Sequence, residues 1–453
     1  LVDRGIHVLC VKDMAGLLKP AASKLLLESL RREFPDLPVH VHTHDTASAG
    51  VASMLAASEA GADVVDVAID AMAGLTSQPS MGALVAALEG TEHDTGIHRT
   101  GLGPIDEYWE QVRELYAPFE SGLKSGSADV YEHEMPGGQY TNLKFQSQAL
   151  GLTGRWTAIK LAYASANRLL GDIIKVTPSS KVVGDLAQFM VQNDLSEADV
   201  REQASTLSFP SSVVDFMRGG IGRPHGGFPE PLRSDILKGI EPFEGRPGES
   251  LQPVDFDALR RELARKVDKE LSEADLLSSA LYPDVFEAYM QHRELYSDLS
   301  VLPTRAFLAP LDWGEEIAVE IERGKRLIVR LETEGETDER GMRPVFFELN
   351  GQARTILVPD RSIEAESVSQ EKADPARPGS IGAPMPGVVI EVLVEAGDEV
   401  ARQSPLVKLS AMKMETVLAS PLAGRVTRVA VAEGASVDGG DLLIELDPDE
   451  AEE

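Results

Sequence analysis

The stretch GIHVLCVKD at residues 5–13 and the stretch LPVHVHTHDT at residues 37–46 read as two short β-strands, with the amphipathic helical stretch AASKLLLESLRREF at residues 21–34 between them. The alternation continues with a helix at 47–62, a strand at 63–72 and a helix at 80–90. Strands that alternate with helices indicate parallel βα units. Three or four such units form half of a (β/α)8 barrel, whose active sites lie at the carboxyl ends of the strands. We therefore expect residues 1–105 to form half of such a barrel.

The rest of the chain changes character several times. Residues 106–300 are predicted to be mostly helical, and residues 301–363 to be rich in β-structure. Within the second segment, VFFELNGQARTILV predicts a hairpin with Asn350 and Gly351 at its turn. Residues 364–380 are polar, lack periodicity and contain two prolines, which predicts a linker.

Residues 381–448 contain an internal repeat. Gly387 matches Gly424 and Gly397 matches Gly434, at an offset of 37 residues that holds along both copies. Two copies of a four-strand unit at constant spacing predict a flattened β-sandwich with quasi-two-fold symmetry. The acidic tail at 449–453 is predicted to be disordered.

Lys413 lies between the two copies, within LSAMKMETV, where a hairpin would join them. An ordinary solvated lysine is the simple interpretation of any single surface lysine. Here a duplicated β-fold, a lysine at the pseudo-symmetric turn and Met412 and Met414 on either side occur together. This combination favours a lysine whose amine is presented for acylation by another enzyme.

Three histidines, His40, His42 and His44, alternate along the predicted second strand and therefore point to one face. The preceding strand ends in Lys12 and Asp13, which would lie beside them at the barrel mouth. Two histidines in this arrangement could bind a metal ion, although His-x-His alone is a weak signal. We interpret His40 as a core or wall residue of the barrel. From the residues alone, the simple alternative for Lys12 is an ion-paired lysine.

Composition limits the classes of function. The 453 residues carry a formal charge of −31, from 74 acidic and 43 basic side chains, which argues against nucleic-acid binding. There is no run of 18 apolar residues, so no membrane span is expected. The single cysteine, Cys10, excludes a disulfide within the chain and is predicted to be a core residue. A start at Leu1 without Met, within an apparent element, predicts a fragment of a longer protein.

Several long strings resemble the biotin-dependent pyruvate carboxylase family. The motif AMKM around Lys413 resembles biotin carboxyl-carrier domains, whereas lipoyl carriers usually place Asp before and Ala after the lysine. The strings that resemble the carboxyltransferase domain of the family are VKDMAGLLKP, HVHTHDT, DVAIDAMAGLTSQPSMGAL, HEMPGGQYTNL and KVTPSSKVVGDLA. This resemblance covers essentially the whole chain.

The resemblance implies specific residue roles. Lys12, carboxylated on its amine, would bind a divalent metal (zinc or manganese) together with His42 and His44. The family's fourth ligand, an Asp on the first barrel strand, and its pyruvate-binding Arg have no counterpart in this sequence. Thr177 would shuttle a proton, although its surroundings alone predict only a turn that opens a helix. Two further residues, Ser180 and Lys181, would line the biotin pocket, and biotin itself would be attached to Lys413.

The expected fold class is multidomain α/β plus β. It comprises the later strands of a (β/α)8 barrel with a helical funnel extension, a β-rich allosteric and tetramerisation segment, and a biotinyl β-sandwich. The implied function is carboxyl transfer from carboxybiotin to pyruvate, giving oxaloacetate, as the C-terminal portion of an ATP- and bicarbonate-dependent enzyme. The ATP and Mg²⁺ site would lie upstream. The implied partners are a biotin protein ligase, acetyl-CoA as an allosteric activator and three further copies in a homotetramer, in the cytoplasm or in the mitochondrial matrix of a eukaryote.

Two alternatives stay open at this point. One is the α subunit of a biotin-dependent oxaloacetate decarboxylase or transcarboxylase, although those relatives tend to have VTPTSQ where this chain has VTPSSK. The other is a non-catalytic biotin carrier module. The first would run the carboxyl transfer in reverse, and the second would catalyse no reaction.

Overall fold

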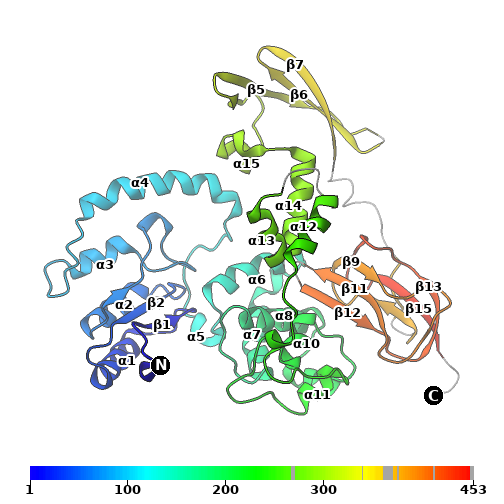
Figure 1. Ribbon diagram of the computed structural model, residues 1–453, viewed down its shortest axis with the longest axis horizontal. Helices are drawn as coiled ribbons and strands as arrows, with labels where there is room; N and C mark the ends of the chain where they lie inside the picture. The colour runs from blue at the N-terminus through cyan, green and yellow to red at the C-terminus, as the bar shows by residue number, and fades with distance from the viewer. Residues whose placement is uncertain (267–270, 339, 361–370, 375–376, 412–413, 449–453) are drawn as a thin grey trace. The chain divides into compact units, whose positions relative to one another are not determined.

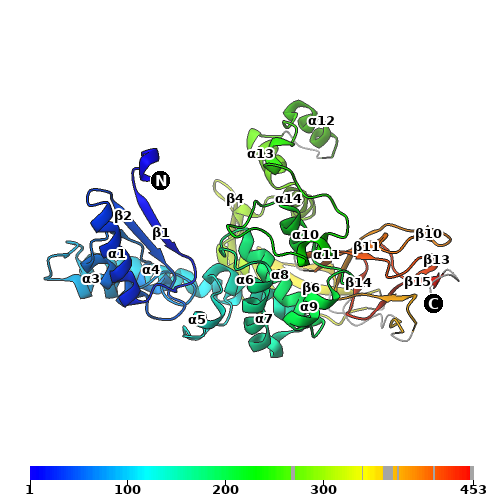
Figure 2. The same cartoon turned by 90° about the horizontal axis from the view of Figure 1, so that it is seen from below.

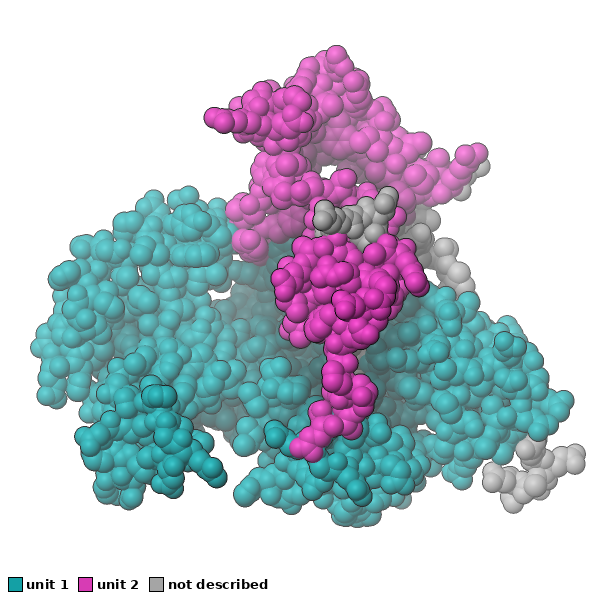
Figure 3. Space-filling model, viewed as in Figure 1, with its two compact units in different colours: residues 1–114, 119–247, 370–453 teal, residues 115–118, 248–369 magenta. Residues whose placement is uncertain are grey.

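The computed structural model describes residues 1–266, 271–338, 340–360, 371–374, 377–411 and 414–448. Its contacts divide the chain into two compact units (Figure 3), one made of residues 1–114, 119–247 and 370–453 and the other of residues 115–118 and 248–369. Lys413, most of the predicted linker and the acidic tail lie outside the described residues.

The predicted βα units are confirmed at the start of the first unit (Figures 1 and 2). The parallel sheet has the order β1-β2-β3, and its elements are β1 (Leu9–Asp13), α1 (Pro20–Glu33), β2 (Val39–Thr43), α2 (Gly50–Glu59), β3 (Val64–Val65) and α3 (Met81–Leu88). The third strand is shorter than predicted. Asp70, near its expected end, instead accepts hydrogen bonds from the Ser80 hydroxyl and the Gly82 N–H at the start of α3, and the chain turns there.

The two faces of β2 have different surroundings. Val39 and Val41 are buried in a core with Leu27 of α1 and Met54 of α2. The alternate residues of β1 and β2 lie on the opposite face, which in a (β/α)8 barrel is the interior. Cys10 belongs to that opposite face and is exposed, so its predicted place in the core is wrong.

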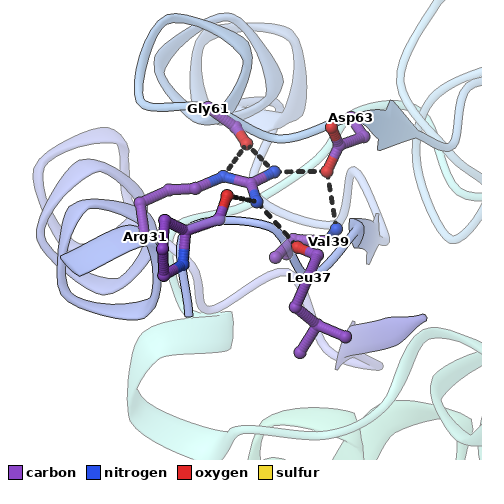
Figure 4. A network of polar contacts seen from close by, with 6 residues as sticks. Arg31, Leu37, Val39, Gly61 and Asp63 are labelled. Carbon is purple, nitrogen blue, oxygen red and sulfur yellow. Dashed lines mark hydrogen bonds and ion pairs between the residues drawn. The ribbon is translucent and has the colours of Figure 1, made fainter. Parts of the chain in front are cut away.

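Arg31 anchors the amino ends of β2 and β3 (Figure 4). From α1, its Nε donates to the carbonyl of Gly61 and its Nη1 to the carbonyl of Leu37, each at 2.7 Å, and its Nη2 pairs with Asp63. Asp63 also accepts the N–H of Val39 at 2.7 Å, and this bond, together with Arg31, holds the pKa of the carboxyl below its usual range. One guanidinium thus ties a helix to the beginnings of β2 and β3, and the other end of β2 carries two of the predicted ligands.

A helical region follows the barrel strands within the first unit. Its core contains Tyr163, Phe189 and Met190, all buried. The helices are α4 (Arg99–Tyr116), α5 (Val130–His133), α6 (Gly137–Ala149), α7 (Trp156–Leu169), α8 (Ser179–Gln192), α9 (Glu197–Gln203), α10 (Ser211–Arg218) and α11 (Leu232–Leu237). Gly184 allows α6 to approach α8, because an added Cβ there would lie 2.5 Å from Nε2 of Gln139. No described helix has both the length and the apolar composition needed to cross a bilayer.

The second unit combines helices with an antiparallel sheet of order β4-β5-β6-β7. Its elements are α12 (Phe256–Lys266), α13 (Glu273–Leu281), α14 (Pro283–Tyr296), α15 (Thr304–Leu308), β4 (Glu316–Glu322), β5 (Lys325–Glu334), β6 (Met342–Leu349) and β7 (Gln352–Pro359). The predicted hairpin is confirmed, with Asn350 and Gly351 both at positive φ, as a type I′ turn requires.

The predicted repeat forms two four-stranded sheets. The strands are β8 (Ser380–Gly382), β9 (Gly387–Val392), β10 (Glu399–Val400), β11 (Pro405–Ala411), β12 (Met414–Ala419), β13 (Gly424–Val429), β14 (Ser436–Val437) and β15 (Leu442–Pro448). The first residues of β9, β10 and β11 precede those of β13, β14 and β15 by the predicted 37 positions. Leu406, Val407, Leu443 and Ile444 are buried in the core of this β-sandwich.

We expect Arg31→Met to lower the free energy of unfolding by about 2 kcal/mol, because the carbonyls of Gly61 and Leu37 lose a charged donor in a partly buried setting. Chemical denaturation of the wild type and the variant measures this difference. Arg99→Met is the matched control, since Arg99 pairs with Glu89 on an exposed surface. Equal losses in the two variants would contradict the anchoring role of Arg31.

Candidate functional site

The predicted ligands Lys12, His42 and His44 come together at the carboxyl ends of β1 and β2. In the parallel ladder Lys12 is the register partner of His42, so the two side chains leave the same face of the sheet. The rings of His42 and His44 lie edge to face, with centroids 5.2 Å apart. The sheet therefore presents one amine and two imidazoles to a common region.

Hydrogen bonds orient both imidazoles in the same way. Nδ1 of His42 lies 2.7 Å from a carboxylate oxygen of Asp66, and Nδ1 of His44 lies 2.7 Å from the carbonyl oxygen of Thr76. Both oxygens are acceptors, so Nδ1 carries the hydrogen in each ring. The Nε2 lone pair of each histidine is then the one that can bind a metal.

Asp66 also contacts His40, which is not among the predicted ligands. Nε2 of His40 lies 2.7 Å from the other carboxylate oxygen of Asp66, so that nitrogen already has a partner. This geometry supports the interpretation of His40 as a wall residue. Although burial alone would raise it, the pKa of Asp66 is lowered, because His40 and His42 both bond to the carboxylate. Asp66 was not among the residues predicted for the site, because the third strand was predicted to run through it to residue 72, whereas the observed β3 ends at Val65 and Asp66 follows directly.

The surroundings of His44 favour its neutral form. Burial lowers its pKa, which favours the unprotonated form that metal binding requires. The ring is also held from behind, since a Cβ added to Gly137 would lie 2.6 Å from Nδ1 of His44. Gly137 in turn donates its N–H to the carbonyl of Met14, in the loop after β1. The HEMPGG string therefore packs directly against the candidate site.

His133 supports the same HEMPGG string. Its Nδ1 accepts the N–H of Met135 at 3.0 Å, and burial lowers the pKa of His133 to about 4. A small cavity next to it is lined by, among others, Thr46, Thr76 and Tyr140. A neutral histidine here stabilises the loop without adding charge beside the candidate site.

Asp13 shapes the loop that follows Lys12. Its two oxygens accept the N–H groups of Gly16, Leu17 and Leu18 at 2.7 to 3.0 Å. It also accepts the hydroxyl of Thr43, the last residue of β2, at 2.9 Å. Asp13 is thus engaged with the backbone and joins the ends of the two strands that carry the predicted ligands.

The donors suit a metal only if Lys12 changes chemically. Among the described residues, no group of three or more His, Cys, Asp or Glu side chains could hold an ion. An ammonium cannot bind a cation, whereas the carbamate formed from a lysine and CO2 offers anionic oxygens. The two Nε2 atoms and such an oxygen give the mixed nitrogen and oxygen shell that zinc and manganese accept.

A second group of predicted residues lies at the start of α8. Thr177 is exposed, Ser180 is buried and Lys181 is partly exposed. The Ser179 hydroxyl, not that of Ser180, holds the turn, because it donates to the carbonyls of Ile174 and Val176 at 2.6 Å. Among the described residues, no hydrogen bond or ring contact joins this group directly to the histidine group.

The predicted biotin-bearing residue, Lys413, lies outside the described residues. The strands before and after it are described, and their last register pair joins Ala411 of β11 to Met414 of β12. The predicted position between the two halves of the repeat therefore agrees with the strand pairing on either side.

Comparison with family models accounts for most of the chain. A model described as "HMGL-like" matches residues 1–107, one described as "Conserved carboxylase domain" matches residues 130–330, and one described as "Biotin-requiring enzyme" matches residues 379–446. These three segments correspond to the strands with the histidines, the region that includes α8 and the β-sandwich.

Two known proteins are similar in sequence to nearly all of this chain. The chain is 53% identical to pyruvate carboxylase 1 of Caenorhabditis elegans over 450 residues and 54% identical to the mitochondrial pyruvate carboxylase of Homo sapiens over 449 residues. Each alignment covers 99% of this chain, but the chain spans only 38% of the length of each relative.

Solved structures give the same result. The complete multifunctional pyruvate carboxylase of Rhizobium etli matches with a TM-score of 0.70 and 46% identity, over 98% of this chain and 41% of that one. Its carboxyl transferase domain with pyruvate and biocytin matches with a TM-score of 0.71 and 49% identity, over 80% of this chain and 60% of that one. Together with the family models, these structures confirm the predicted multidomain α/β fold with a biotinyl domain.

We expect Asp66→Asn to lower the affinity of the site for a divalent metal roughly 10-fold or more, because the amide no longer enforces the hydrogen on Nδ1 of His42. Elemental analysis after dialysis against graded concentrations of a chelator measures this change. Asp70→Asn is the matched control, since Asp70 bonds to Ser80 and Gly82 and not to an imidazole. Equal metal retention in Asp66→Asn and wild type would show that Asp66 does not orient a ligand.

Proposed function

Since this chain belongs to the pyruvate carboxylase family, we propose that it performs the carboxyl-transfer half of that reaction, in which pyruvate becomes oxaloacetate. The observation that carries the proposal is the register pairing of Lys12 with His42, beside a second histidine with the same ring orientation. A cation at such a place would stabilise the enolate that forms from pyruvate. The β-sandwich of the same chain would supply the carboxyl carrier.

The metal would be held by the carboxylated Nζ of Lys12 and by Nε2 of His42 and His44. A bound zinc or manganese ion supplies Lewis acidity, which stabilises negative charge on the enolate oxygen of pyruvate. The chain's own contribution is orientation. Asp66 and Thr76 hold the imidazoles ready before substrate arrives.

Thr177 would move the proton. A hydroxyl can donate and accept at once, so its Oγ1 can take a proton from the methyl group of pyruvate while giving up its own toward the biotin ring. Its exposure supports this role, because substrate must reach it. The hydroxyl of Ser180 and the ammonium of Lys181 would donate hydrogen bonds to the ureido oxygen of biotin as negative charge develops there.

Lys413 would carry the biotin. A prosthetic group tethered through a flexible lysine and the linker at 364–380 reaches the site at a high effective concentration. The support for this position is the pairing of β11 with β12 on either side and the match of residues 379–446 to biotin-requiring enzymes.

The complete protein would add the rest of the reaction. ATP, Mg²⁺ and bicarbonate would be used in an upstream biotin carboxylase domain, and a biotin protein ligase would modify Lys413. We also propose a homotetramer and activation by acetyl-CoA through the segment at 301–363. Relatives from mouse and human are named mitochondrial, so a eukaryotic source would place the protein in the matrix and a bacterial source in the cytoplasm.

Two variants of the full-length protein test the proposal. We expect Lys413→Ala to lack biotin by intact mass and to lose pyruvate carboxylation, yet to decarboxylate oxaloacetate when free biotin is added. Thr177→Ala should keep its biotin and lose that decarboxylation about 100-fold or more, because proton transfer has no carrier. A coupled assay for the pyruvate released from oxaloacetate measures the decarboxylation by both variants.

The wild-type protein provides the decisive comparison with the alternatives. ATP- and bicarbonate-dependent oxaloacetate formation supports the proposal. Sodium-coupled decarboxylation of oxaloacetate that needs no ATP would contradict the proposal and support a decarboxylase subunit. Biotinylation without either activity would support a carrier module alone.

A further inference from the structure

Asp185 is a fully buried carboxylate within α8, one helical turn after Lys181. One of its oxygens, Oδ2, accepts a hydrogen bond from Nζ of Lys181 at 2.6 Å and another from the hydroxyl of Ser212 in α10 at 2.6 Å. Its side chain has no exposed surface, and its Oδ1 has no hydrogen-bond partner among the described residues. The Asp185 carboxylate therefore lies in an apolar helical core, where Oδ2 accepts two hydrogen bonds and Oδ1 accepts none from the described residues.

Such an arrangement is costly for a purely structural residue. Burial raises the pKa of Asp185, and the bonds from Lys181 and Ser212 only oppose that effect. The neighbours Val183 and Leu186 on the same helix are buried apolar residues, so an apolar side chain would suit the position for packing. Replacing a buried ion pair with apolar residues is often neutral or stabilising. Packing and stability therefore do not explain the carboxylate.

The geometry instead acts on Lys181. Residues four apart lie on one face of a helix, so Asp185 is one turn from Lys181 on the same face of α8. Its carboxylate holds the ammonium of Lys181 against the helix. Ser212 binds the same oxygen from another helix, which keeps the carboxylate from rotating with the lysine. The side chain of Lys181 remains 40% exposed, so its ammonium is held without being buried. An ammonium has three donors, and only one is used by Asp185.

We propose that Asp185 is a positioning residue that, together with Ser212, holds the ammonium of Lys181 in place for the biotin ring. The inference rests on the proposed function, in which Lys181 lines the biotin pocket. A long lysine side chain has many rotamers, and the anchored carboxylate selects one of them before biotin arrives. The remaining donors of the ammonium then point at a defined place when charge develops on the ureido oxygen.

A double-mutant cycle on the full-length protein tests the coupling. We expect Asp185→Asn to lower kcat for oxaloacetate decarboxylation with free biotin about 10-fold, with little change in KM for oxaloacetate, since only the biotin side of the site is disturbed. In a Lys181→Met background the same substitution should change kcat by less than about two-fold, because a residue that acts through Lys181 has nothing left to position. Equal effects in both backgrounds would overturn the inference.

A chemical measurement checks the same contact without relying on activity. Reductive methylation followed by peptide mass spectrometry reports how freely the amine of Lys181 reacts. We expect a several-fold faster reaction in Asp185→Asn, because the 2.6 Å bond to the carboxylate is lost. Lys160, which pairs with Asp129 at 2.6 Å, is the internal control and should react at an unchanged rate. An unchanged rate at Lys181 would also overturn the inference.

Ser212→Ala provides a second variant that leaves the carboxylate in place. It should shift kcat and the methylation rate in the same direction as Asp185→Asn, by a smaller factor, and it carries the test if Asp185→Asn does not fold. Ser196→Ala is its matched control, because that hydroxyl also donates to a carboxylate, of Asp199, in the capping box of α9. If the wild-type protein does not decarboxylate oxaloacetate, the proposed function is refuted. If the wild type is active but Asp185→Asn lowers kcat by the same factor with and without Lys181→Met, only the role of Asp185 is refuted.

Discussion

The parallel pairing of β1 with β2 is the constraint on which the candidate site depends. The register that aligns Lys12 with His42 also aligns Val11 with Val41 on the opposite, helix-covered face. A shift of one residue would move the valines to the interior and the ligands into the hydrophobic core. Burial of the apolar face therefore sets the position of the polar one, and the Arg31 anchor holds the amino ends of β2 and of its other neighbour, β3.

Around these two strands and at α8, hydrogen-bond acceptors orient the side chains of the candidate site. Asp66 and the carbonyl of Thr76 set which nitrogen of each histidine carries the hydrogen, and Asp185 holds an ammonium by the same kind of charge-assisted bond. In each case one residue fixes the direction of another that would bind the metal or the biotin. Preorganised groups of this kind contribute to catalysis because they need no rearrangement when charge develops.

Local patterns of the sequence were enough to predict the βα units, the Asn350-Gly351 hairpin and the repeat. The βα units follow from the alternation of strand and helix patterns, the hairpin from the two residues at its turn, and the repeat from the constant spacing between matching residues. The convergence of Lys12 with His42 followed from the rule that parallel strands end together. Cys10 was assigned to the wrong face, since its apolar run is shared by both faces of the strand. The roles of Asp66 and Asp185 depend on partners as far away as Ser212, 27 residues from Asp185, and no local pattern identifies such contacts. The individual site roles stay predictions, and Lys413 lies outside the described residues.

Anomalous diffraction from crystals of the full-length protein would locate a metal bound between β1 and β2. We expect a metal peak about 2.0 to 2.1 Å from Nε2 of both His42 and His44, with additional density for a carboxyl group on Nζ of Lys12. A metal bound through Nδ1 of either ring, a metal on His40, or a Lys12 that stays unmodified beside an occupied site would contradict this expectation.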